Sequence, residues 1–357
     1  FMDPRAESDA RHARAREFGG AFERGAPMPE AFDALAGDLA DFQARNNAGY
    51  ARLRAARGED VPAVPTDAFK VARVSAFEEK DTPVVFRTSG TTVGARGSHW
   101  FRTTATYDAG SVAFGRVALD AREPLAVIVL GPPPLDQPDC SLTHMIGRFV
   151  QSMGSHASIA ETYFLRDGVL DLEALDERVT RLLMSNTRGA IVLGTSLAYV
   201  HFLDAIGDAR FRMPEATRVM QTGGFKTLGR EVDAAALRRD LARALCIDES
   251  AIASEYGMTE LSSQFWEMTL RGGAKNVYAE PPWARVVPVD PETLAPVADG
   301  EIGVARIEDL LTVDSAVAIV TADRVRRIAG AGFELLGRQV GAPPRGCSLA
   351  TEEMLGA

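Results

Sequence analysis

The chain has 357 residues, of which 46% are hydrophobic and 25% charged, and its formal net charge is −10 at pH 7. This composition excludes a disordered chain and a disulfide-framed miniprotein, and an acidic chain without a basic patch is a poor candidate for binding nucleic acid. The sequence contains no run of about 18 apolar residues that would predict a membrane span. The cysteines, Cys140, Cys246 and Cys347, are three in number and far apart, which favours a reducing cytoplasm over a zinc site.

The first 57 residues carry apolar side chains at helical spacing and predict two or three helices. Residues 83–101 predict a strand, a loop rich in Ser, Thr and Gly, and a second strand. Further helices are expected at 107–122, 141–154, 171–186, 197–206 and 230–245, with strands at 125–131, 189–196 and 218–224. The segment SEYGMTEL predicts a strand, a turn and a helix, and short antiparallel strands are expected after about residue 277. This alternation predicts an α/β fold with layered, mostly parallel sheets and a small antiparallel region.

The loop at 88–97, TSGTTVGARG, concentrates hydroxyl groups and glycines between two strands. Such a loop can direct backbone N–H groups and hydroxyls toward phosphate oxygens, and Arg96 can add a cation. It is not a Walker loop, because the GxxxxGK[ST] order is absent. A plain hairpin turn is the alternative interpretation.

The segment SEYGMTE at 254–260 places a hydroxyl, Thr259, beside a carboxylate, Glu260. This pair could hold a metal ion bound to a polyphosphate. Capping of a helix N-terminus by the same two residues is the alternative.

The segment QTGGFK at 221–226 ends a predicted strand with two glycines. Glycine allows a flat ligand such as a nucleobase to approach the backbone closely. An ordinary turn between strand and helix would have the same pattern.

In order and spacing, the three segments resemble the acyl-adenylate-forming superfamily. They are more similar to the LuxE-type acyl-protein synthetases, through GGFK at 223–226, EYGMTELSSQFW at 255–266 and FELLGRQVGAPPRGCSL at 333–349. The resemblance covers about residues 65–350. Together with the helical spacing of the first residues, it predicts an N-terminal helical region at 2–65, an adenylate-forming core domain at 66–336, and a hinge with a truncated C-terminal segment at 337–357. In the phosphate loop, Val93, Ala95 and Arg96 replace the glycine, proline and lysine of the superfamily.

The resemblance implies ATP-dependent conversion of a carboxylic acid into an acyl-AMP and pyrophosphate. By resemblance, Glu260 would ligate Mg²⁺, Thr259 would bond the α-phosphate, and Asp323 would bond the ribose. The other residues implied in nucleotide binding are Ser89, Gly90, Thr91, Thr92 and Arg96 at the phosphates, and Gly223, Gly224, Tyr256 and Gly257 around the adenine. Arg338 matches the arginine at the hinge between the lobes.

Long members of the superfamily also carry a lysine in a C-terminal lobe, whereas this sequence has no lysine after Lys275. Lys226 is the first candidate for that missing cation and Arg96 the second, although Lys226 could be a solvated turn lysine.

In the LuxE-type family, a cysteine near the C-terminus accepts the acyl group as a thioester. Cys347 matches it, and Arg345 could favour the thiolate. If Cys347 is instead a packed side chain, coenzyme A or a phosphopantetheine carrier would accept the acyl group.

His144 lies where the superfamily often lines the acid pocket, with a core or surface histidine as the alternative. Met258 and Phe265 are further candidates for the pocket, and packing explains Phe265 equally well. The substrate would be a fatty or aryl acid, and the partner an acyl-carrier protein or an acyl reductase. Two alternatives remain open. One is a coenzyme A or carrier-protein ligase for a small aromatic or amino acid in secondary metabolism, and the other is a catalytically degenerate scaffold of a reductase or synthase complex.

Overall fold

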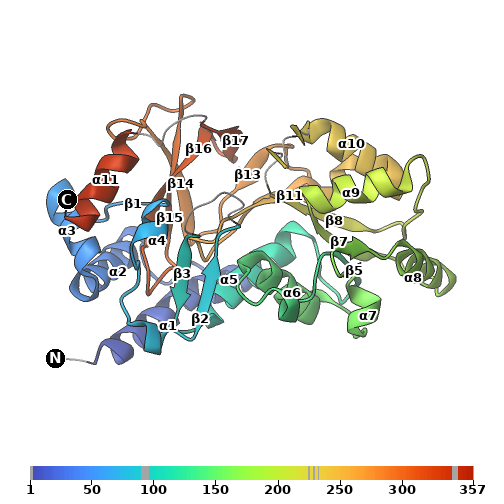
Figure 1. Ribbon diagram of the computed structural model, residues 1–357, viewed down its shortest axis with the longest axis horizontal. Coiled ribbons are helices and arrows are strands. Elements are labelled where there is room, and N and C mark those ends of the chain that lie inside the picture. The colour runs from blue at the N-terminus through green and yellow to red at the C-terminus, as the bar shows by residue number, and fades with distance from the viewer. Residues whose placement is uncertain are drawn as a thin grey trace.

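The computed structural model describes residues 3–89, 96–223, 226–227, 230–231, 233–339 and 345–356, with only the backbone at 226–227 and 230–231. Strands run through the centre of the molecule and helices lie around them (Figure 1).

Three helices begin the chain, as the apolar spacing predicted: α1 (Pro4–Glu23), α2 (Phe32–Asn46) and α3 (Ala48–Arg57). The Asp3 side chain caps α1 by accepting from the Arg5 backbone N–H. The Asn47 side chain caps α3 by accepting from the Tyr50 N–H. Each cap satisfies a backbone donor that the first turn of a helix leaves free.

Within the described residues, the main sheet has eleven strands, and its parallel half is β4 (Ala126–Leu130), β7 (Ala190–Thr195), β8 (Arg218–Thr222) and β11 (Ile252–Tyr256). Helices cover both faces of this half, and β4 (AVIVL) and β7 (AIVLGT) are accordingly almost entirely apolar. Ile128 and Val192 pack toward one face, in the cluster that includes α8 (Leu172–Met184), α9 (Ser196–Ile206) and α10 (Ala234–Leu245). Val129 and Leu193 pack toward the other face, with α5 (Ala105–Ala118) and α6 (Ser141–Met153).

The other half of the sheet is antiparallel, as predicted for the region after residue 277. Its order from β11 is β12 (Phe265–Glu267), β13 (Val277–Ala279), β17 (Gly332–Arg338), β16 (Ala318–Ile328), β15 (Ile302–Asp309) and β14 (Ala284–Val289). The short β1 (Val64–Pro65) pairs with β16 in parallel.

The helix predicted after the SEYGMTEL strand is wrong, because residues 257–264 form a turn that leads into β12. Phe265 and Trp266 are fully buried and pair with β11, where Trp266 lies opposite Glu255. A strand partner for β11 therefore prevails over the helical pattern.

The loop-flanking strands form a separate antiparallel hairpin of β2 (Val84–Arg87) and β3 (Ser98–Phe101), as predicted. The sequence did not predict α11 (Arg345–Leu355), which packs against α3 and β1. The short elements are α4 (Ala68–Val71), α7 (Ile159–Thr162), β5 (Leu165–Arg166), β6 (Val169–Leu170), β9 (Lys226–Thr227), β10 (Arg230–Glu231) and the 3-10 turns Glu79–Asp81, Pro134–Asp136, Glu249–Ala251 and Thr269–Arg271. Among the described helices, none has the length and apolar character that crossing a bilayer requires.

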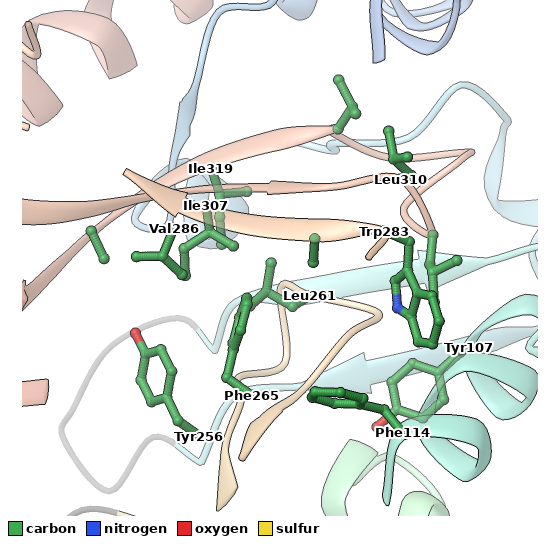
Figure 2. Packing of buried hydrophobic residues seen from close by; sticks show 14 of the residues in the cluster. Tyr107, Phe114, Tyr256, Leu261, Phe265, Trp283, Val286, Ile307, Leu310 and Ile319 are labelled. Atoms are coloured by element: carbon green, nitrogen blue, oxygen red, sulfur yellow. The ribbon is translucent and has the colours of Figure 1, made fainter. Parts of the chain in front are cut away.

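One large hydrophobic cluster joins α1–α3, the hairpin and the antiparallel strands. Figure 2 shows Val286, Ile307 and Ile319 on the strands beside Leu261 and Phe265, with Trp283, Phe114 and Tyr107 farther along. Tyr256 lies at the opposite end of this group in the same view. Tyr256, one of the residues that the sequence suggested for nucleotide binding, is therefore held by the hydrophobic cluster.

Candidate active site

The carboxyl ends of the parallel strands β8 and β11 form one side of the candidate site. Gly223 directly follows β8 with φ +92°, a conformation that favours glycine. The Ser196 hydroxyl at the start of α9 donates to the carbonyls of Thr222 (3.2 Å) and Gly223 (3.1 Å), which fixes the end of β8. In open α/β sheets, ligands bind in the crevice outside these strand ends.

The turn after β11 is held from two directions. From the hairpin, His99 Nδ1 lies 2.8 Å from the carbonyl oxygen of Thr259. From β15, Asp309 accepts from the Ser262 N–H (2.8 Å) and the Ser263 hydroxyl (2.6 Å). The turn that carries Thr259 and Glu260 is thus tied to both the hairpin and the antiparallel half of the sheet.

Two features define the local chemistry of this turn. Burial lowers the pKa of His99 to about 4, so its ring is neutral at pH 7 and, because a carbonyl can only accept, Nδ1 carries the proton. A Cβ on Gly257 would lie 2.4 Å from Oε1 of Glu255, so a side chain at this position would require that buried carboxyl to move.

Glu260 is a buried carboxyl, and burial raises its pKa to about 7. Its own backbone N–H and the positive charges of Arg338 and Lys70 act in the opposite direction. The described residues include no cluster of three or more His, Cys, Asp or Glu side chains that could enclose a metal ion. One carboxylate fits Mg²⁺, which is commonly held by one or two carboxylates together with substrate phosphates.

The predicted ribose and adenine residues are in direct contact. The Tyr256 hydroxyl donates to Oδ2 of Asp323 at 2.8 Å, joining β11 to β16. Asp323 lies opposite Arg338 in the β16–β17 ladder, and the Arg338 side chain is exposed. The Tyr256 ring packs edge-on to Phe333 at 5.9 Å. Residues of β11 therefore meet residues of the consecutive strands β16 and β17, which lie more distant in the sequence.

The phosphate loop is described only at its ends. Ser89 is exposed, while Gly90, Thr91, Thr92 and also Gly224 lie outside the described residues, as does the side chain of Lys226. The Arg96 guanidinium donates to the carbonyls of Thr88 (2.7 Å) and Arg87 (3.2 Å) and pairs with Asp139 at 2.9 Å. Its charge is therefore already partnered at the foot of the loop.

The residues predicted near the acid pocket are placed as follows. His144 Nε2 lies 2.6 Å from Oδ1 of Asp108, and its ring packs 5.2 Å from Phe86. Met258 is half-buried against the core, whereas Phe265 is 0% exposed and packs against Phe333 at 5.4 Å. Phe265 is thus part of the hydrophobic core.

Cys347 is buried on α11, beneath α3 and β1. Burial raises the pKa of its thiol to about 11, Asp67 raises it further, and Arg57 lowers it. This environment favours the thiol rather than the thiolate that we expected from Arg345. No described contact joins Cys347 to Glu260, Tyr256 or Asp323.

Sequence reasoning missed two charged groups beside the site. Glu255 precedes Tyr256, accepts from the Thr222 hydroxyl, and has a pKa that burial raises to about 7. Lys70 on α4 acts electrostatically on Glu260. The signal that could have identified Lys70 is the scarcity of lysine, since the chain has only four.

Comparison with known proteins gives consistent results. A family model described as "Acyl-protein synthetase, LuxE" matches residues 54–356. The long-chain-fatty-acid–luciferin-component ligase of Aliivibrio fischeri is 24% identical over 319 residues, which are 83% of this chain and 79% of that protein.

Solved structures share the fold. A 2-hydroxyisobutyryl-CoA ligase in complex with 2-HIB-AMP and CoA superposes with a TM-score of 0.54 at 11% identity, covering 85% of this chain and 73% of that one. ATP-bound MatB of Rhodopseudomonas palustris superposes with a TM-score of 0.50 at 15% identity, covering 74% of this chain. The match spans about half of MatB, 49% of its chain. The α/β fold is therefore that of adenylate-forming enzymes.

Proposed function

Because the chain belongs to the LuxE family of acyl-protein synthetases, we propose that it uses ATP to activate a carboxylic acid as an acyl-adenylate and then transfers the acyl group to a thiol. The observation that carries this proposal is the hydrogen bond between Tyr256 and Asp323 beside the buried carboxyl of Glu260. These residues meet at the carboxyl ends of β8 and β11, where an α/β sheet binds its ligands.

In the activation step, a carboxylate oxygen of the acid attacks the α-phosphorus of ATP, and the bond from that phosphorus to the leaving pyrophosphate breaks. Both reactants are anions, so the site must screen their repulsion and fix their alignment. Asp323 would bond the ribose, Tyr256 and Gly223 would flank the adenine, and Thr259 would bond the α-phosphate. Glu260 would hold Mg²⁺, which neutralises charge on the phosphates.

In the transfer step, a thiolate sulfur attacks the acyl carbon, the bond to the AMP oxygen breaks, and AMP leaves. Cys347 is the acceptor that the family pattern favours, with subsequent delivery to an acyl reductase partner. The name of the Aliivibrio fischeri relative supports a long-chain fatty acid as the substrate. All three cysteines are free, which fits a cytoplasmic location.

A second candidate is transfer to coenzyme A or to a carrier-protein phosphopantetheine. It is favoured by one observation, the burial and raised pKa of the Cys347 thiol. An external thiol would need no movement of α11.

The experiment combines pyrophosphate release with intact-protein mass spectrometry after incubation with ATP, Mg²⁺ and a panel of fatty and aryl acids. We expect pyrophosphate release with at least one acid and a thioester adduct on the wild type that is absent from Cys347→Ala. The matched control is Cys246→Ala, which removes an exposed thiol and should keep the adduct. Thioester formation on added coenzyme A by Cys347→Ala at the wild-type rate would support the second candidate. No pyrophosphate release with any acid would refute both and favour a degenerate scaffold.

A further inference from the structure

The single-turn helix α4 is linked through His99 of β3 to the turn that carries Glu260. It contacts β1 and β3. The ring of Phe69 meets the His99 ring edge-on at 5.9 Å, and His99 binds the Thr259 carbonyl at 2.8 Å. Phe69 also lies beside Gly97 at the foot of the phosphate loop, because a Cβ on Gly97 would be 3.5 Å from that of Phe69. This chain of contacts fixes α4 between the phosphate loop and the turn.

The next residue, Lys70, brings a positive charge to this position. Among the described side chains, Lys70 and Arg338 both act electrostatically on the Glu260 carboxyl and favour its anionic form. The other two lysine side chains that the structure describes are paired elsewhere, Lys80 with Glu78 and Lys275 with Glu249.

In this structure, Lys70 forms a weak ion pair with Asp67 that another anion can replace. Its Nζ lies 2.7 Å from Oδ1 of Asp67, and the two side chains are 44% and 42% exposed. Exposed pairs of this kind contribute about 0–1 kcal/mol, so a triphosphate can readily replace Asp67 as the partner. Arg96, in contrast, is already held by Asp139 and two backbone carbonyls.

We propose that Lys70 is a catalytic residue of the adenylation step, whose ammonium group leaves Asp67 and binds phosphate oxygens beside Glu260. This inference rests on the proposed function and assigns the cation that we first sought in Lys226 or Arg96. Lys70 stabilises the negative charge that moves onto pyrophosphate as the bond to the α-phosphorus breaks, and it transfers no proton. A compact ammonium on a flexible stem suits this task.

The test measures acid-dependent pyrophosphate formation and, separately, acyl transfer from chemically prepared acyl-AMP. Lys70→Ala should lower kcat for pyrophosphate formation by about 100-fold or more, the usual loss when one charge-stabilising donor is removed. Lys70→Arg should recover part of that loss. The rate of acyl transfer from prepared acyl-AMP should stay within about twofold of the wild type in Lys70→Ala, because the transfer step breaks no phosphoanhydride bond. Lys80→Ala is the matched control and should match the wild type in both assays.

Three results would overturn the assignment. The first is a wild-type kcat in Lys70→Ala, and the second is a large loss in Lys226→Ala with none in Lys70→Ala. The third is an equal loss in both assays, because that would indicate a structural defect. If the wild-type chain releases no pyrophosphate with any of the acids tested, the proposed function itself is refuted, and the role of Lys70 with it.

Discussion

At the residue scale, the site is built around two glutamates whose anionic forms the fold disfavours. Burial raises the pKa values of Glu255 and Glu260 to about 7 in both cases. Glu260 faces the charges of Arg338 and Lys70, whereas the Thr222 hydroxyl is the group that favours ionised Glu255. Glu260 is thus suited to receive a cation, whereas the ionisation of Glu255 is favoured only by the Thr222 hydroxyl among the groups that act on it.

Glu255 should therefore make the protein less stable as the pH rises. A carboxyl with a raised pKa gives its full stabilisation below its unfolded pKa of about 4.5, and this is lost as the pH rises through about 7. Glu255→Gln removes the ionisation, so relative to the wild type it should gain about 1–3 kcal/mol of unfolding free energy between about pH 5 and pH 8. Urea denaturation at both pH values measures this gain. Glu17→Gln, whose parent side chain is 53% exposed, is the control, and a pH-independent difference for Glu255→Gln would contradict the prediction.

The Tyr256 hydroxyl should matter through Asp323. Tyr256→Phe removes the 2.8 Å hydrogen bond, which leaves Asp323 less constrained for ribose binding. We expect stability to fall by about 1 kcal/mol and the Kd for ATP to rise about 3- to 10-fold, as measured by calorimetry. Tyr50→Phe is a close control, because the Tyr50 hydroxyl is buried without a hydrogen-bond partner. Loss of affinity in both variants, or in neither, would argue against a positioning role for Tyr256.

At the element scale, α11 is held in place by arginines on α3. Arg52 donates to the carbonyl of Met354 through Nε (3.0 Å) and Nη2 (2.7 Å). Arg57 pairs with Glu353 at 2.5 Å. While these contacts persist, the Cys347 thiol stays buried, so the proposed acylation of Cys347 would require α11 to separate from α3.

Arg52→Ala should therefore expose Cys347. We expect its reaction with a thiol reagent to accelerate about tenfold or more, because opening α11 would cost about 1.4 kcal/mol less. Arg54→Ala, on the same helix, is the control, since Arg54 pairs with Asp41 on α2. Peptide mass mapping separates Cys347 from the exposed Cys246. An unchanged reaction rate at Cys347 would contradict the role of Arg52 in holding α11 against α3.

Strands were predictable from the sequence where a continuous apolar run left no competing helical pattern. The runs AVIVL and AIVLG are buried on both faces and form β4 and β7, as expected. The turn at 257–264 was not predictable, because its anchors, His99 and Asp309, lie about 160 and 47 residues away from their partners Thr259 and Ser262. The same limit applies to the site. The motifs pointed to Tyr256 and Asp323, which the structure joins by a hydrogen bond, whereas no motif pointed to Lys70.

At the scale of the whole molecule, the hydrophobic core crosses the boundaries that the resemblance implied. Phe18, Leu35 and Leu39 of the first helices share one cluster with Ile307 and Val317 of the antiparallel half. The division into a helical region, a core domain and a C-terminal segment at residues 65 and 336 remains a prediction. The packing indicates that the helical region and the core domain unfold together.

Leu39→Ala tests this cooperativity. Leu39 is 0% exposed, and truncating such a side chain costs about 2–5 kcal/mol. If the core is continuous, the variant should unfold in a single transition at lower temperature, with the signals of the N-terminal helices and of the sheet shifted equally in hydrogen exchange. A shift confined to residues 3–57 would show an independent helical region.

The account as a whole depends on where a nucleotide binds. The most direct measurement is a crystal structure of the chain with ATP, Mg²⁺ and a fatty acid. The account predicts the ribose hydroxyls on Asp323, the adenine between Gly223 and Tyr256, and the triphosphate beside Glu260 and Lys70. A nucleotide bound elsewhere, or none at saturating ATP, would contradict it.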